Sequence, residues 1–218
     1  MFASVNAEAL LRIAATRALL RTAQALEAAG PSGHPSSRTI KGLAFVQNYA
    51  VYEFVNKEGV RVLIGAANTA AVPRNQARAP LLGLALDPLF SKVIAGAEKN
   101  TWSARAELLE QTRVPDPLRI ADSLFPKDGS FFRPSQLELV WSLFGIRAPI
   151  VPDNRLLGHI IEMVDTRNAI AHGSTAADAI GGRFSIKEIE RRIDDTEAVC
   201  SHILLTFSAY LSGPNPFK

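Results

Sequence analysis

Helix-forming runs alternate with Gly- and Pro-rich breaks along the first part of the chain. Residues from about 5 to 29 are rich in Ala, Leu and Arg, which favour helices, and the run ends at Gly30-Pro31-Ser32-Gly33. A second helix is predicted over about 39–66. Its middle, from Leu43 to Val55, is apolar nearly all round, which indicates a buried helix.

The rest of the chain shows shorter helical patterns that proline-containing loops separate. Helices are expected at about 81–96, 102–112, 136–144, 153–172 and 185–211, with loops at 68–80 and 125–134. Ser135 is expected to cap the helix that follows it, and Ser185 with Glu188 to form a capping box. Gly181-Gly182 indicates a tight turn. Because no strand alternation, repeat or sustained heptad is present, the pattern predicts an all-α fold, most simply one antiparallel helical bundle.

Polar residues interrupt the apolar stripe of the segment at 153–172. At about 100° per residue, the stripe holds Leu157, Ile160, Ile161, Val164 and Ala171, flanked by Leu156 and Met163, with Arg155, His159, Glu162 and Thr166 opposite. Arg167 projects into this stripe, Asn168 lies on it and His172 is at its edge. Burying such groups costs free energy unless they are paired. Function is therefore expected here.

Arg167, Asn168 and His172 suit the cleavage of an RNA phosphodiester. A histidine can take a proton from a 2′-hydroxyl or give one to the leaving oxygen, and an arginine can hold the phosphate. Asn168 can orient either, and the scheme needs no metal. A purely structural alternative is that Arg167 and His172 only cap the C-terminus of a helix, with Gly173 following as the C-cap glycine. Five residues place Arg167 and His172 about 140° apart, so a shared site favours a two-fold dimer.

Composition sets only loose bounds. The 218 residues are 47% hydrophobic and 21% charged with a net charge of +3, which suits one sizeable core and is compatible with nucleic acid without demanding it. The single cysteine, Cys200, excludes a disulfide framework and a Cys-rich zinc site, and is expected to be buried. No apolar run is long enough for a membrane span and no signal peptide is evident, so a cytoplasmic protein is expected.

The remaining histidines carry little chemical signal. His34 and His159 are expected to be solvated, and His202 to be structural. They lack paired acids at ligand spacing, and no phosphate-binding glycine loop is present. The sequence therefore predicts no metal site and no cofactor.

Taken with the upstream segment Leu43 to Phe54, the run Arg167-Asn168-Ala169-Ile170-Ala171-His172-Gly173 resembles the HEPN superfamily. The likeness is to prokaryotic HEPN-like nucleases of toxin and defence systems. It implies a helical bundle over about 39–211 that forms a homodimer, with residues 5–29 packed on it or as an arm of one domain, 1–218. It also implies a composite, metal-independent RNase site in which Arg167 and His172 are catalytic and Asn168 is supporting.

The resemblance also suggests supporting residues and partners. Tyr49 and Glu53 share a helix face, and Glu53 is expected either to orient Arg167 or to pair locally with Lys57. Ser174 stands where some toxin members carry a tyrosine that a partner enzyme modifies, so control by that route is not expected. An antitoxin or another regulatory protein is the partner that such a toxin would have.

Arg191-Arg192 and the run from Arg74 to Arg78 are candidates for contacts to an RNA backbone, although such charges are usually only a solvated surface. Arg74 and Arg78, in the expected loop at 68–80, are the better candidates of the two sets. Two other functional classes stay open at this point. One is a helical module that binds RNA or a nucleotide without cutting it, and the other is a structural dimerisation bundle.

Overall fold

The computed structural model describes residues 1–96, 100–121 and 132–218, and these confirm the all-α class. Within those ranges the chain forms no sheet, only an isolated bridge between Pro73 and Pro117. No helix in the described part of the chain is both long and apolar enough to cross a membrane.

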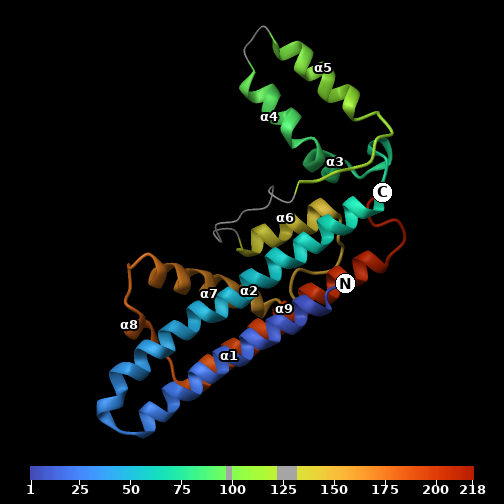
Figure 1. Cartoon of the computed structure of the whole chain (residues 1–218). Coiled ribbons are helices and arrows are strands. Elements are labelled where there is room, and N and C mark those ends of the chain that lie inside the picture. The colour runs from blue at the N-terminus through green and yellow to red at the C-terminus, as the bar shows by residue number, and fades with distance from the viewer. Residues whose placement is uncertain (97–99, 122–131) are drawn as a thin grey trace.

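Three long helices form the body of the molecule (Figure 1): α1 (Ala3–Ala28), α2 (His34–Ala70) and α9 (Ile186–Ser212). The expected antiparallel arrangement holds for α1 against both of the others. By contrast, α2 and α9 run in the same direction, since Asn48 meets Thr196 and, further along both helices, Gly59 lies against Phe207. Parallel neighbours need a long connection, and the intervening chain supplies it by building the remaining helices.

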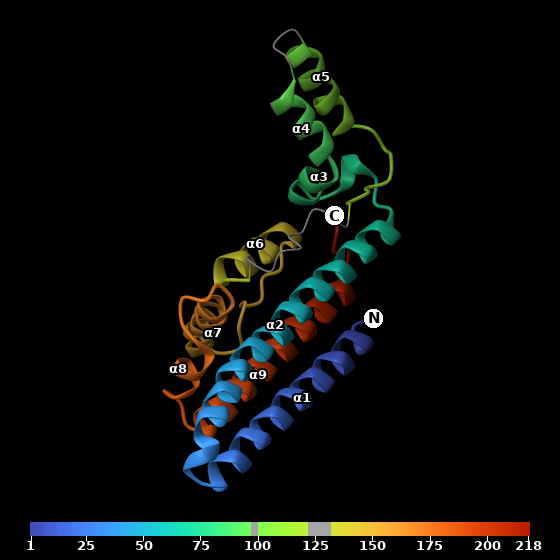
Figure 2. The ribbon, with the colours of Figure 1, turned by 60° about the vertical axis from the view of Figure 1, so that its left-hand side comes forward.

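A second layer covers the side of α2 and α9 that faces away from α1 (Figure 2). It consists of α6 (Pro134–Phe144), α7 (Arg155–Ala171) and the short α8 (Ala177–Gly181). The helix α2 contacts α1, α7, α8 and α9, which explains why its middle is apolar nearly all round. The largest fully buried side chains include Phe45, Tyr49, Tyr52, Phe144 and Phe207.

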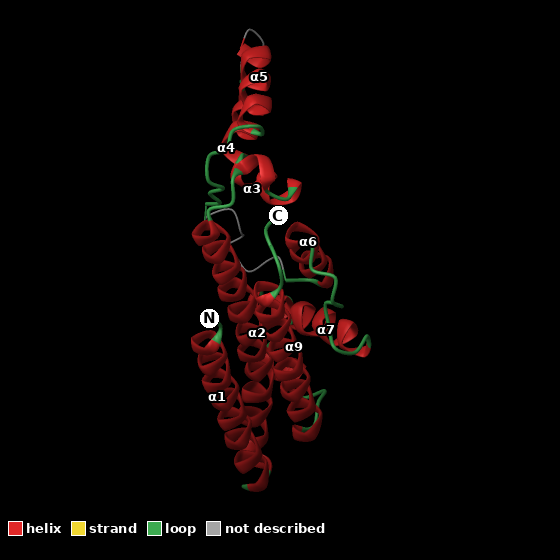
Figure 3. Cartoon of the chain, turned by 90° about the vertical axis from the view of Figure 1, so that its right-hand side faces the viewer, coloured by secondary structure: helices red, strands yellow, loops and turns green. Residues whose placement is uncertain are grey.

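The helices α3 (Ala79–Ala85), α4 (Asp87–Ala95) and α5 (Thr101–Gln111) extend beyond one end of the long helices (Figure 3). The single helix expected at 81–96 is wrong, because the chain breaks at Leu86 and restarts with Pro88 in the first turn of α4, where proline needs no amide partner. Lys92 of α4 and Glu107 of α5 form an ion pair with an N···O distance of 2.6 Å.

Several helix ends differ from the expectation. The helix α2 begins at His34 instead of 39, with Pro35 in its first turn, and it continues to Ala70, into the expected loop at 68–80. Ser135 does not cap α6, because Pro134 already occupies the first turn and Arg133 takes the cap position. Most of the expected loop at 125–134 lies outside the described residues.

Two end signals are confirmed. The capping box of Ser185 and Glu188 starts α9. Gly173 follows α7 with φ +72°, a conformation that glycine adopts without strain.

Candidate functional site on helix α7

Arg167 lies near the C-terminal end of α7 and is partly buried against α2. Its guanidinium carbon is 4.9 Å from the centre of the Tyr49 ring, within cation–π range. Its Nη1 donates a 2.9 Å hydrogen bond to Oδ1 of the adjacent Asn168. No carboxylate of a described residue forms an ion pair with it. The guanidinium is therefore held in place while no carboxylate in the described part of the chain compensates its charge.

His172 occupies the C-cap position of α7, and its side chain is exposed. Other groups already satisfy the carbonyls at the helix end: the amide of His172 donates to Asn168 O (3.0 Å), and both the Thr175 amide and the Ser174 hydroxyl donate to Ala169 O (3.1 Å each). The imidazole makes no hydrogen bond to any residue that the structure describes. These contacts give no support to the purely structural alternative, in which the His172 ring caps the helix.

Glu53 lies on α2 but pairs with Lys57, the local alternative, and not with Arg167. The expected Glu53–Arg167 pair is absent among the described residues. The physical reason is that Lys57 stands one turn along the same helix, where its ammonium reaches the carboxylate without any tertiary contact. Tyr49, only 1% exposed, lies beneath Arg167 and positions this cation in place of Glu53.

The buried face of α7 is rotated from the predicted stripe. The buried residues are Leu156, His159, Ile160, Met163 and Val164. Ile161, predicted to be in the stripe, is 43% exposed, and Ala171 is also exposed. Because α7 packs against both α2 and α9, the face it buries includes a polar residue that meets polar partners there.

His159 is that residue, and the expectation that it is solvated is wrong. Its Nε2 lies 2.9 Å from Oγ1 of Thr196 on α9, and Asn48 of α2 donates to the same oxygen from 2.7 Å. Burial lowers the pKa of His159 and so favours the neutral ring. Sequence periodicity missed it because one polar residue on a buried face is recognisable only when its partners on other helices are known.

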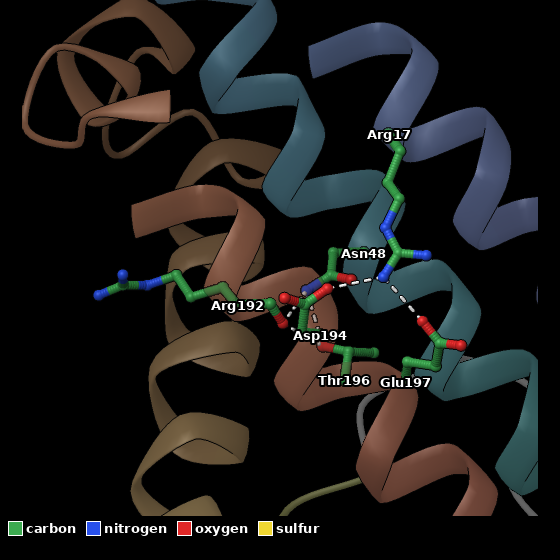
Figure 4. A network of polar contacts seen from close by, with 6 residues as sticks. All are labelled: Arg17, Asn48, Arg192, Asp194, Thr196 and Glu197. Carbon is green, nitrogen blue, oxygen red and sulfur yellow. Dashed lines mark hydrogen bonds and ion pairs between the residues drawn. The ribbon is translucent and has the colours of Figure 1, made fainter. Parts of the chain in front are cut away.

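Polar contacts made by residues of α9 connect this helix to α2 and to α1 (Figure 4). Asn48 Nδ2 also donates to the carbonyl oxygen of Arg192 at 3.2 Å. On the other side of α9, Arg17 of α1 donates to Asp194 at 2.6 Å and to Glu197 at 2.8 Å (Figure 4). The hydrogen bond to Asp194 is the main reason that the pKa of Arg17 is raised.

A polar pocket of about 280 Å³ opens between α7 and α9 on the outer side of His159. It is lined by Arg155, His159, Glu162, Arg191, Arg192 and Asp195. Glu162 accepts two hydrogen bonds from the Arg192 guanidinium, at 3.0 and 2.7 Å. No sequence signal singled out this pocket, because its two halves lie about 30 residues apart and meet only through packing.

Arg74 and Arg78 are both folded back against the protein. Arg74 donates from Nη1 to Gln111. The guanidinium of Arg78 lies so close to Gly145 that a Cβ there would be 1.8 Å from Nη2. The Nε atoms of both are buried without a hydrogen-bond partner. Both arginines are partly buried against the chain next to α3, and their contact with RNA stays a prediction.

The remaining single candidates have structural positions. His34 is exposed at the start of α2, and Nε2 of His202 lies 2.8 Å from Pro149 O, as expected of a structural histidine. Cys200 is buried, as predicted, and burial raises the pKa of its thiol. Among the described residues, no group of three His, Cys, Asp or Glu side chains has the placement to hold a metal ion.

Comparison with known proteins adds no relative: no protein-family model, no curated protein and no solved structure matches this chain.

Proposed function

We propose that this protein is a homodimeric, metal-independent endoribonuclease of the HEPN type that acts as a toxin or defence effector. Arg167 binds the scissile phosphate, His172 transfers protons, and Asn168 and Tyr49 position Arg167. Glu53 has no part in this scheme, since it pairs with Lys57.

The observation behind the proposal is that Arg167 is partly buried without a carboxylate partner among the described residues. A partly buried arginine is normally paired with a carboxylate, because desolvating an uncompensated charge is costly. Arg167 instead rests on the Tyr49 ring and bonds only a neutral amide of a described side chain. This arrangement fixes the guanidinium and leaves its positive charge for an anion from outside, such as the phosphate of RNA.

His172 supplies the proton transfer in this proposal. Its ring takes the proton of a ribose 2′-hydroxyl while the 2′ oxygen attacks phosphorus. The P–O5′ bond then breaks, and the same proton passes to the 5′ oxygen. The products are a 2′,3′-cyclic phosphate and a 5′-hydroxyl, so no water or metal enters this step. Arg167 stabilises the negative charge that builds on the phosphoryl oxygens.

An outward face of α7 supports the dimer. Leu157, Ile161, Asn168 and His172 fall within about 60° of arc around the helix axis. Ile161 is 43% exposed on this face, although a solvated helix face is usually polar. A two-fold axis through it would bring the two His172 rings toward the partner's motif.

The test is cleavage of bulk RNA and tRNA in excess EDTA by the wild type, Arg167→Ala and His172→Ala. Matched controls are Arg183→Ala and His34→Ala, which remove exposed residues of the same types away from α7. Circular dichroism and size-exclusion chromatography establish that all five proteins are folded and equally oligomeric. We expect cleavage by the wild type and both controls, ending in 2′,3′-cyclic phosphate, and its loss in the two motif variants.

Two outcomes contradict the proposal. Cleavage that persists in Arg167→Ala and His172→Ala would show that the site is elsewhere. RNA binding without cleavage by any of the proteins would favour the alternative of a non-catalytic RNA-binding module.

A further inference from the structure

The pocket between α7 and α9 is lined by the cations Arg155, Arg191 and Arg192 and the acids Glu162 and Asp195. Glu162 is bound by Arg192, and Asp195 is 3.3 Å from Nη2 of Arg155, whose Nε also pairs with Asp153 at 3.0 Å, so these acids are already paired. Arg191 also lines the pocket, is exposed, and forms no ion pair with any residue that the structure describes. Arg191 is thus the lining cation that no described acid pairs with.

The hydrogen bonds of Thr196 assign the proton of His159. The hydroxyl of Thr196 lies 3.0 Å from the carbonyl oxygen of Arg192, the back-bond that helical threonines commonly make, and this uses its single hydrogen. Its oxygen then accepts from Asn48 and from Nε2–H of His159. The remaining ring nitrogen, Nδ1, is left as an acceptor.

Nδ1 of His159 is open to a ligand. It makes no hydrogen bond to a described residue, and His159 lines the pocket. A ligand that fits must present anionic oxygens to Arg191 and a hydrogen-bond donor to Nδ1. Carboxylates and sulfate offer only acceptors at neutral pH, whereas a singly protonated phosphate offers both.

From this geometry we infer a second site in the protein, a pocket for hydrogen phosphate or the terminal phosphate of a small phosphate monoester. Arg191 binds the anionic oxygens, and His159 Nδ1 shares the ligand's proton. The volume of about 280 Å³ admits a phosphate with a small substituent. His159 and Arg167 are eight residues apart, about 12 Å along α7, so this site is separate from the proposed RNase site.

The shared proton makes binding depend on pH. The groups facing His159 are Arg155 and Glu162 from α7 and Arg191, Arg192 and Asp195 from α9, while α2 contributes the uncharged Asn48. A free phosphate monoester loses its second proton at a pH of about 6, and burial keeps free His159 neutral. The complex with a monoester therefore holds one more proton than its separated parts, and its affinity falls about tenfold per pH unit between pH 7.5 and 8.5. Inorganic phosphate keeps a proton of its own through this range, so its affinity stays nearly constant.

The test is isothermal titration calorimetry with inorganic phosphate, glycerol phosphate and sulfate at pH 7.5, at constant ionic strength. We expect saturable binding of one or both phosphates, about tenfold tighter than any binding of sulfate, because sulfate has no proton to share. Arg191→Gln should weaken phosphate binding about tenfold by removing a charged hydrogen-bond donor. Lys187→Gln, which removes an exposed cation one turn away on α9, is the matched control and should change nothing.

His159→Gln tests the proton itself. Glutamine can still donate to Thr196 but cannot share a titrating proton, so the preference for phosphate over sulfate and the pH dependence of glycerol phosphate binding should both disappear. The proposal is overturned if phosphate does not bind saturably, if sulfate binds equally well, or if Arg191→Gln or His159→Gln behaves like the wild type. None of these results depends on RNA cleavage, so failure here is distinguishable from failure of the proposed RNase activity.

Discussion

At the scale of single residues, His159 makes the stability of the fold depend on pH. Burial lowers the pKa of this ring below its unfolded value of about 6.5. Above pH 6.5 neither state carries the proton and the contribution is constant. As pH falls through 6.5, the unfolded chain takes up a proton that the folded chain refuses, so the free energy of unfolding decreases toward the folded pKa.

We therefore expect the wild type to lose up to about 1 kcal/mol more than His159→Gln between pH 7 and 5.5. Urea denaturation at several pH values in a buffer free of phosphate measures this difference, and the absence of phosphate keeps ligand binding out of the comparison. Parallel curves for the two proteins would contradict the prediction, because they would mean that His159 titrates alike in both states.

The sequence identified residue types better than it identified their partners. Arg167 stood out because it interrupts an apolar stripe, and the structure indeed finds it partly buried. That Tyr49 lies beneath it, and that Glu53 pairs with Lys57, follows from the packing of α7 on α2. The burial of His159 was missed for the same reason. A period of 3.6 residues locates a buried face only approximately when one helix packs against two others.

At the scale of elements, helices of 11 residues or more were predicted well, whereas the shorter α3, α4 and α8 were not. The helices α1, α2 and α9 have strong propensity or clear caps, so local sequence predicts them. Such signals are missing for α8, which spans only Ala177–Gly181. Isolated helices of this length are unstable, so α8 depends on its contact with α2. The expected tight turn at Gly181-Gly182 is in fact where α8 ends against that helix.

Gly42 allows the close approach of α2 and α8. A Cβ at this position would lie 2.0 Å from the carbonyl oxygen of Ala177, a backbone atom that cannot move without displacing α8. We expect Gly42→Ala to lower the free energy of unfolding by about 2 kcal/mol or more through overpacking. Gly65→Ala on the same helix is the control: nothing lies within 4 Å of its Cβ, so higher helix propensity should stabilise by up to about 1 kcal/mol.

Chemical denaturation of both glycine variants distinguishes these effects. Equal changes of stability in Gly42→Ala and Gly65→Ala would mean that propensity alone matters and that α8 is not held against α2 as closely as described.

The outward face of α7 carries a prediction on dimerisation. Ile161→Glu adds a charge to the centre of the proposed interface, and burying it unpaired is costly. We expect the variant to be a folded monomer by sedimentation, with RNA cleavage lost. Leu139→Glu on α6 is the matched control, because Leu139 is 51% exposed and lies off this face. An Ile161→Glu variant that stays dimeric would place the interface elsewhere.

At the scale of the whole molecule, the two motif residues face different ways. Arg167 is turned toward Tyr49 on α2, while His172 is exposed beyond the end of α7. This agrees with the separation of about 140° around the helix axis that their spacing implies. Local sequence therefore predicts the two chemical groups, whereas their assembly into one site depends on a symmetric contact that no single-chain pattern specifies.

Mixing inactive variants tests that assembly. If Arg167 of one protomer acts with His172 of the other, a heterodimer of Arg167→Ala and His172→Ala has one intact site and one doubly mutated site. Random exchange makes half of the dimers mixed, so RNA cleavage should recover to about one quarter of the wild-type rate. Mixtures in which Ile161→Glu has been added to both chains are the control and should stay inactive. No recovery, despite proven subunit exchange, would mean that one protomer supplies both groups to each site.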